Sequence, residues 1–250
     1  MDLSSVSIGL IAIVLPAIAL GSLIKGITGL GLPLVAVPAI ASFTSVEEAV
    51  VLMIIPIFGS NLWLVTTHRR FRNMLREHVP FLIAGFFGGI GGTFLLVAIE
   101  DRWLKLLLAA WLALYLVQYF LGDLLRFLFR ARGAASAVIG LTAGTVQGAT
   151  GISSHIVAPF FHGRGLRPDA YAFLIASAFL SFSAAQLIAA AERELFTSER
   201  LVLGLGALVP TLLFTQLGVR LAPRVPSGVF QALLLTLFVL MEIKLIADIV

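Results

Sequence analysis

Cysteine is absent from this 250-residue chain, and charged residues are scarce. The missing thiols exclude disulfide bonds, thiolate catalysis and metal sites ligated by cysteine. Asp, Glu, Lys and Arg make up 12% of the residues, well below the roughly 25% of soluble domains, whereas hydrophobic residues make up 60%. With a mean hydropathy of +1.06, this balance is typical of an integral membrane protein with no room for an additional soluble domain.

Several functional signatures are also missing. The first basic residue is Lys25, so no basic segment precedes the opening apolar run and a cleavable signal peptide is not expected. No Walker motif, dinucleotide fingerprint or metal-ligand set occurs, so we expect no cofactor and no metal. A hydrolase built on Ser154 and His155 is disfavoured, because no separate histidine lies in an apolar span to act as its base. The chain is therefore predicted not to be an enzyme.

Apolar runs repeat in the same order in each half of the chain. Each half contains one run with a shorter companion, followed by three runs long enough to cross a bilayer, which needs about 20 helical residues. The runs are 7–24 with 32–43, 49–66, 79–99 and 102–121, then 135–147 with 152–161, 170–190, 200–219 and 228–248. We predict an all-α polytopic membrane protein with repeats at 1–125 and 133–250, joined by a basic cytoplasmic linker at 126–132 into one transmembrane domain.

The shorter companions follow a duplicated break. Gly26-Ile27-Thr28-Gly29 with Pro38 and Gly148-Ala149-Thr150-Gly151 with Pro159 are offset by 122 residues at the glycines and 121 at the prolines. In hydrocarbon, irregular backbone survives only inside protein or beside a wet cavity, because every freed N–H and C=O needs a partner. Paired breaks in a two-fold repeat therefore indicate the substrate site of a transporter.

The loop charges bear on how the broken elements are oriented. The net charge of +4 would suggest nucleic acid in a soluble protein, but here the basic residues separate hydrophobic runs and indicate topology instead. If both broken elements enter and leave on one side, the Lys and Arg clusters near 69–76, 126–132, 164–167 and 220–224 all become cytoplasmic. The charge pattern favours this re-entry over full crossing, and re-entry gives the two repeats opposite orientations.

Glycines at intervals of four residues predict close helix contacts. These are Gly85 with Gly89, Gly88 with Gly92, and the series Gly140, Gly144, Gly148 that leads into the second break. Small residues at this spacing let membrane helices approach closely.

The first break supplies groups for an anion. Glycines unwind the chain, Pro33 suits the first turn of the next half-helix, and the exposed N–H groups of that helix start favour negative charge. Lys25 would add a whole charge, although it could instead reach a lipid headgroup. The candidate binding residues here are Lys25, Thr28, Gly29 and Gly31.

The second break is rich in neutral polar groups, which stabilise an oxyanion without burying further charge. Ser153 and Ser154 could equally be helix caps, and His155 could be a packing residue. The candidate binding residues here are Gln147, Thr150, Gly151, Ser153, Ser154 and His155, and Asn61 and Gln186, in corresponding spans of the two halves, are candidates to line the same cavity.

These motifs resemble the TauE/SafE sulfite exporter family, also called the four-toluene-sulfonate uptake permease family. The resemblance rests on Gly26-x-x-Gly29-x-Gly31-x-Pro33 with Pro38, on Gly148-x-x-Gly151 with Pro159, and on the stretch 218–226 before the last apolar run. The usual Gly-Gly-Gly run of the family is replaced by Gly29-Leu30-Gly31 in the first copy and by Gly151-Ile152-Ser153-Ser154 in the second. The resemblance implies a secondary carrier of the bacterial inner membrane for sulfite, sulfonates, sulfoacetate or other small anions.

We therefore expect a multi-pass permease of two inverted repeats that moves a small anion by alternating access, driven by protons or by the substrate gradient. Its expected partners are the anion, protons and the lipid bilayer, with no nucleic acid, and a homodimer is compatible with the sequence. The alternatives are a passive anion channel and, with less support, a membrane assembly protein.

Overall fold

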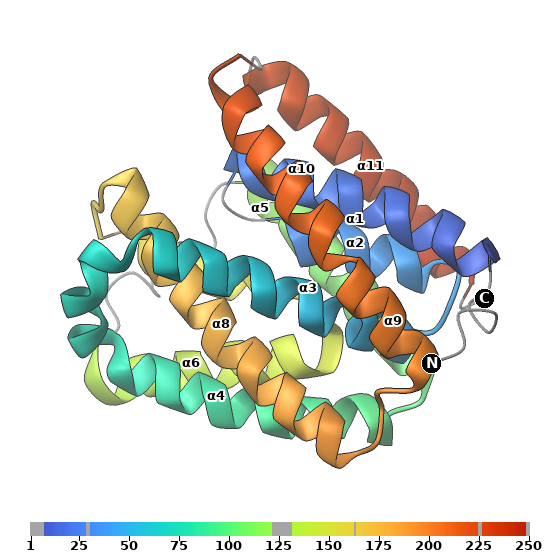
Figure 1. The fold of residues 1–250 in the computed structure, drawn as a ribbon, viewed down its shortest axis with the longest axis horizontal. Coiled ribbons are helices and arrows are strands. Elements are labelled where there is room, and N and C mark those ends of the chain that lie inside the picture. The colour runs from blue at the N-terminus through green and yellow to red at the C-terminus, as the bar shows by residue number, and fades with distance from the viewer. Residues whose placement is uncertain (1–7, 29–30, 122–131, 163, 225–226, 249–250) are drawn as a thin grey trace.

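The computed structural model describes residues 8–28, 31–121, 132–162, 164–224 and 227–248, and every regular element among them is a helix (Figure 1). This confirms the predicted all-helical fold. The helices are α1 (Ile8–Thr28), α2 (Leu32–Ala41), α3 (Val46–Thr67), η2 (Arg69–Met74), α4 (Leu75–Ala98), α5 (Asp101–Leu121), α6 (Gly133–Thr150), α7 (Ser154–His162), α8 (Pro168–Glu192), α9 (Ser198–Gly206), α10 (Leu208–Leu221), η4 (Ala222–Arg224) and α11 (Ser227–Ala247).

Within the described residues, five helical segments are long and apolar enough to cross a membrane, namely Gly9–Thr28, Val46–Thr67, Arg69–Ala98, Pro168–Glu192 and Ser198–Leu221. The two companion runs form the short helices α2 and α7. The predicted run 200–219 consists of two consecutive helices, α9 and α10, that meet at Ala207. Of the predicted linker 126–132, only Arg132 lies within the described residues, where it precedes α6.

Helix α6 and helix α7 form a hairpin whose two outer ends lie at the same end of α4. A Cβ on Gly140, near the start of α6, would overlap the backbone of Phe81. Phe160, near the end of α7, stacks on the Phe81 ring with centroids 4.4 Å apart, and Phe161 meets the His78 ring edge-on at 5.2 Å. Both helices of the second broken element therefore pack against the first half of α4.

Glycines bring two helix pairs into backbone contact, as their spacing predicts. A Cβ on Gly144 of α6 would overlap the carbonyl oxygen of Gly85 of α4, and the same holds between Gly26 of α1 and Thr215 of α10. The broken helix of each half thus packs against a whole span of the other half. Figure 1 shows α4 beside α6 and α1 beside α10, with α3 between the pairs and α8 crossing over α4 and α6.

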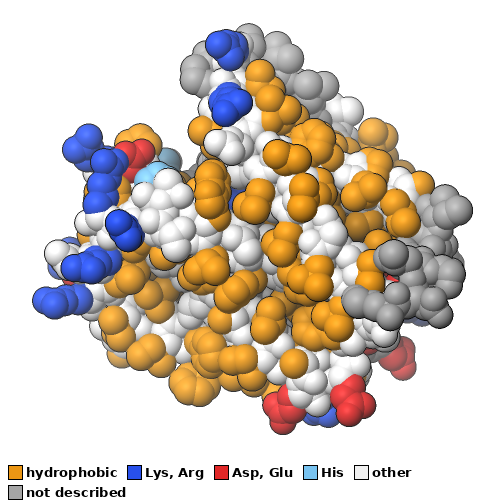
Figure 2. All heavy atoms as spheres, viewed as in Figure 1, with side chains coloured by type: hydrophobic (Ala, Val, Ile, Leu, Met, Phe, Trp, Pro, Cys, Tyr) orange, Lys and Arg blue, Asp and Glu red, His pale blue; other side chains and the backbone are white. Residues whose placement is uncertain are grey.

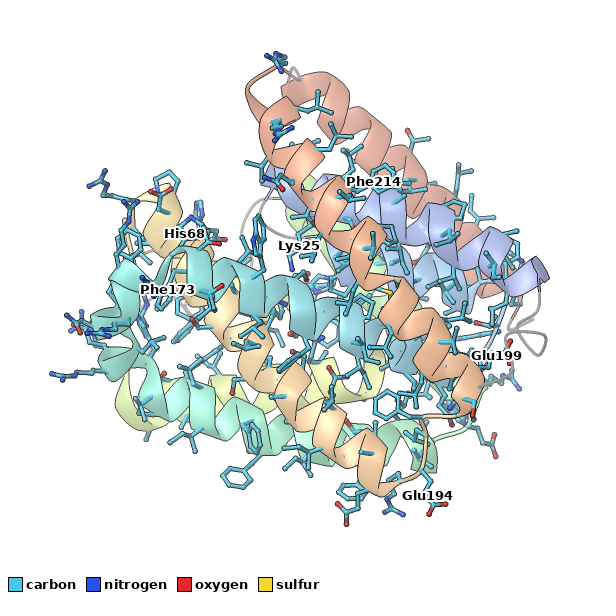
Figure 3. All side chains as sticks on the ribbon, viewed as in Figure 1. Lys25, His68, Phe173, Glu194, Glu199 and Phe214 are labelled. Atoms are coloured by element: carbon cyan, nitrogen blue, oxygen red, sulfur yellow. The ribbon has the colours of Figure 1, made fainter. Side chains whose placement is uncertain are left out.

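In Figure 2, Lys and Arg gather at the left and the top of the molecule, and most of the visible Asp and Glu side chains lie at the lower right. At one end Arg70, before α4, pairs with Asp169 in the first turn of α8. At the other end Arg200 of α9 pairs with Glu47 and Glu48 in the first turn of α3. Figure 3 shows the labelled His68 at the first end and Glu194 and Glu199 at the second.

Candidate functional site

The first break separates α1 from α2. Gly31 precedes α2 with a φ of 134°, a conformation that side-chain-bearing residues rarely adopt, and Pro33 lies in the first turn of the helix. Gly29 lies outside the described residues. Glycine at position 31 and proline at position 33 thus explain why a new helix starts here rather than α1 continuing.

Lys25 points into the protein just before this break. Its side chain is buried, with 5% of the residue exposed, and its ammonium donates to Ser60 Oγ at 2.9 Å and to Asn61 Oδ1 at 3.0 Å. The Asn61 amide nitrogen donates in turn to the carbonyl of Ile57 at 2.8 Å, which fixes the amide with its oxygen toward Lys25. Lys25 therefore does not extend toward a headgroup, and Figure 3 shows it in the interior where α1 approaches α3.

No carboxylate balances the Lys25 charge among the described residues. Its hydrogen-bond acceptors are neutral oxygens, and its place in the last turn of α1 adds only the partial negative charge of the helix end. A buried cation with neutral partners is costly, and an incoming anion would offset that cost. The basic residues that form ion pairs in the described part of the chain are Arg70, Lys105, Arg200 and Lys244.

The second break is a compact hydrogen-bonded loop. Gly151 ends α6 in the left-handed conformation, with φ 72°, and its N–H donates to the Gln147 carbonyl at 2.7 Å. The Gln147 side chain donates to the Gly151 carbonyl and accepts from Ser153 Oγ, each at 2.9 Å. Gln186 of α8 donates to the Gln147 carbonyl at 3.1 Å. Gln147 and Gln186 therefore hold the loop in shape.

The two threonines of the glycine motifs bond within their own hairpins. Thr28 donates to the Ile24 carbonyl at 2.9 Å, and Thr150 donates to the Val146 carbonyl at 2.8 Å. Thr150 also accepts from the N–H of Ile152 at 3.3 Å. In this conformation both hydroxyls bond to carbonyl groups in the last turn of their own helix.

Ser154 and His155 open helix α7. Both are buried, and the Ser154 hydroxyl has no hydrogen-bond partner among the described residues. The His155 ring packs against the indole of Trp111, with centroids 5.3 Å apart. Ser154 Oγ and Gln186 Oε1 are thus polar groups of predicted residues that stay open to a further partner.

Residues 14–245 match the family described as Sulfite exporter TauE/SafE. The chain belongs to this family. No curated protein and no solved structure matches it significantly. As a TauE/SafE member with apolar helices of spanning length, it is a multi-pass membrane protein of a transporter family. The matched range includes both breaks and every predicted site residue.

The described site residues of this TauE/SafE protein form two clusters at different depths. Their separation can be judged along α3, because Val50 of this helix lies beside Gly151 of the second break and Asn61 binds Lys25 of the first. These two positions on α3 are about 16 Å apart at 1.5 Å per residue. Val37 of α2 also contacts Gly151, so apolar side chains from α2 and α3 pack against the second break.

Ser60 belongs to the first cluster, although the sequence analysis did not select it. A serine in an apolar helix usually bonds its own backbone, and Ser60 also donates to the Ile57 carbonyl at 3.2 Å. Only its position next to Asn61 could have indicated it. Asn61, which the sequence analysis did select, bonds to Lys25 at the first break, and Gln186 bonds to Gln147 at the second.

Proposed function

We propose that this chain is a secondary transporter of small anions such as sulfite, sulfonates or sulfoacetate. The observation that carries this proposal is the buried Lys25 ammonium, which has only neutral side-chain partners in the described part of the chain. Lys25, Ser60 and Asn61 would hold the anion beside the start of α2, where Gly31 lies against the Lys25 backbone. The match to the TauE/SafE family supports an anion as the transported solute.

Two inverted repeats form the second part of the proposal. Gln147 follows Lys25 by 122 residues, the same offset as the glycine motifs, and each contacts a polar residue of a whole span. Asp169 follows Glu47 by the same offset, and each pairs with an arginine of the other half. These equivalent contacts at opposite ends support halves of opposite orientation.

The proposed topology places the arginine-rich end in the cytoplasm and the acidic end outside the inner membrane. The segregation of charge supports this orientation under the positive-inside rule. The α6–α7 hairpin, with both outer ends at the start of α4, would then re-enter from the cytoplasm.

The second break would form a second binding site on the path of the anion. Thr150, Ser153, Ser154, His155 and Gln147 could exchange their internal bonds for bonds to the anion when the hairpin moves. The Ser154 hydroxyl, which has no partner among the described residues, supports a role for this break in anion binding. Movement of one repeat against the other would expose the Lys25 cluster and this second site to opposite sides of the membrane in turn. A proton gradient would drive uphill transport.

Transport by the purified chain in proteoliposomes tests this function. We expect saturable uptake of sulfite or methanesulfonate that becomes uphill when a proton gradient is imposed. Unsaturable flux that ignores the gradient would identify a passive channel instead. Absence of anion flux through correctly inserted protein would favour an assembly role.

A further inference from the structure

Lys25 is the only Lys, Arg, Asp or Glu that is buried among the residues the structure describes. The side chains bonded to it, those of Ser60 and Asn61, are neutral. The second break adds hydroxyls, amides and the His155 imidazole, but it lies about 16 Å farther along α3. The site at Lys25 therefore offers at most one positive charge and no second cation.

The ammonium also has a free bonding position. A lysine ammonium has three N–H donors, and two of them are directed to Ser60 and Asn61. Within the described residues the third donor has no acceptor. One oxygen of an anion could take it, while the two neutral partners keep the ammonium in place.

We propose that this site selects singly charged anions, such as alkanesulfonates and hydrogen sulfite, over doubly charged anions such as sulfate. One buried cation and a monoanion form a neutral pair, whereas a dianion leaves a net negative charge in a region of low dielectric constant. The proposal rests on the proposed anion transport and assigns the charge of the transported species.

Methanesulfonate and sulfate provide a matched pair of probes, because both are tetrahedral and similar in size but differ by one charge. Equilibrium binding to the purified full-length protein should favour methanesulfonate by about tenfold or more. Lys25→Gln should lose methanesulfonate binding, and Lys25→Arg should keep the preference for the monoanion. Lys105→Gln serves as the control, because Lys105 pairs with Asp101 and Asp248 away from the site.

The outcomes separate this inference from the proposed function. If sulfate binds as tightly as methanesulfonate and both depend on Lys25, the charge selection is overturned while anion binding stands. If neither anion binds and neither is transported by monodisperse wild-type protein, the proposed function fails as well. Methanesulfonate binding that survives Lys25→Gln would place the site elsewhere and overturn the inference.

Discussion

The Lys25 ammonium donates to Asn61 Oδ1 across 3.0 Å, linking the end of α1 to the last third of α3. The Ile57 carbonyl holds the Asn61 amide in the orientation that this bond requires. Because the acceptor is an amide and not a carboxylate, the lysine charge is oriented but not neutralised. This relationship distinguishes the proposed anion site from a structural ion pair.

Replacing Asn61 with aspartate should convert the anion site into an ion pair. We expect Asn61→Asp to lower methanesulfonate affinity by at least about tenfold, or ~1.4 kcal/mol, while the melting temperature stays at or above that of the wild type. The carboxylate would occupy the position that the anion needs and satisfy the buried charge. Calorimetric titration and thermal unfolding of the same preparations measure both effects.

Asn61→Leu serves as the control for that exchange. It removes the acceptor without adding charge, so we expect a loss of about 1–3 kcal/mol in stability from the less satisfied ammonium. Unchanged methanesulfonate affinity in Asn61→Asp would show that the anion does not use the Lys25 charge.

The close contact between α4 and α6 should tolerate a methyl group only where space is open. A Cβ on Gly88 would overlap the carbonyl oxygen of Leu141, whereas a Cβ on Gly91 of the same helix meets nothing within 4 Å. Gly88→Ala should therefore destabilise the protein by about 1–3 kcal/mol, and Gly91→Ala should not. Thermal unfolding in detergent measures the difference, and equal melting temperatures would argue against this contact.

The two ion pairs between the halves should differ in strength. The Arg200 side chain is 14% exposed and bonds to both Glu47 and Glu48, whereas the Arg70 and Asp169 side chains are 66% and 49% exposed. Arg200→Gln should therefore loosen the acidic end far more than Arg70→Gln loosens the basic end.

A single cysteine can report this loosening, because the chain has none of its own. We expect Ser154→Cys to react slowly with an impermeant maleimide in proteoliposomes, and several-fold faster when Arg200→Gln is added. Arg70→Gln is the matched control and should leave the rate near its starting value. Equal acceleration by both changes would contradict the expectation that the Arg200 ion pairs hold the acidic end more firmly than the Arg70 ion pair holds the basic end.

Sulfite offers a test by pH, because it changes from a monoanion to a dianion as the pH rises. At constant total sulfite, we expect binding to fall in step with the fraction present as hydrogen sulfite. Methanesulfonate keeps one charge over the same range, so its profile reports changes in the protein, and sulfite binding should fall more steeply with pH than methanesulfonate binding. Sulfite binding that rises with pH would contradict selection of the monoanion.

Much of the fold could be predicted from the sequence, because most of the long α-helices are continuous apolar runs. The runs 102–121 and 228–248 correspond to α5 and α11 within one residue at each end. The breaks were also predictable, since Gly31 and Gly151 adopt positive φ angles that favour glycine. These features depend on local backbone chemistry, which the sequence carries directly.

The arrangement of the site could not be predicted in the same way. The sequence could not show that the described residues of the first break bond to Ser60 and Asn61, or that Val37 and Val50 pack against Gly151 of the second break. Nor could the sequence show that Thr28 and Thr150 bond to their own helices. Such contacts depend on helix tilt and depth, which hydrophobic periodicity does not determine.

The most direct test of the central claim is a crystal structure with 2-bromoethanesulfonate, whose bromine can be located by anomalous scattering. The account predicts bromine density beside Lys25, with a sulfonate oxygen about 3 Å from the ammonium nitrogen. Density only at the second break, with the Lys25 ammonium still bonded to Ser60 and Asn61 alone, would contradict it.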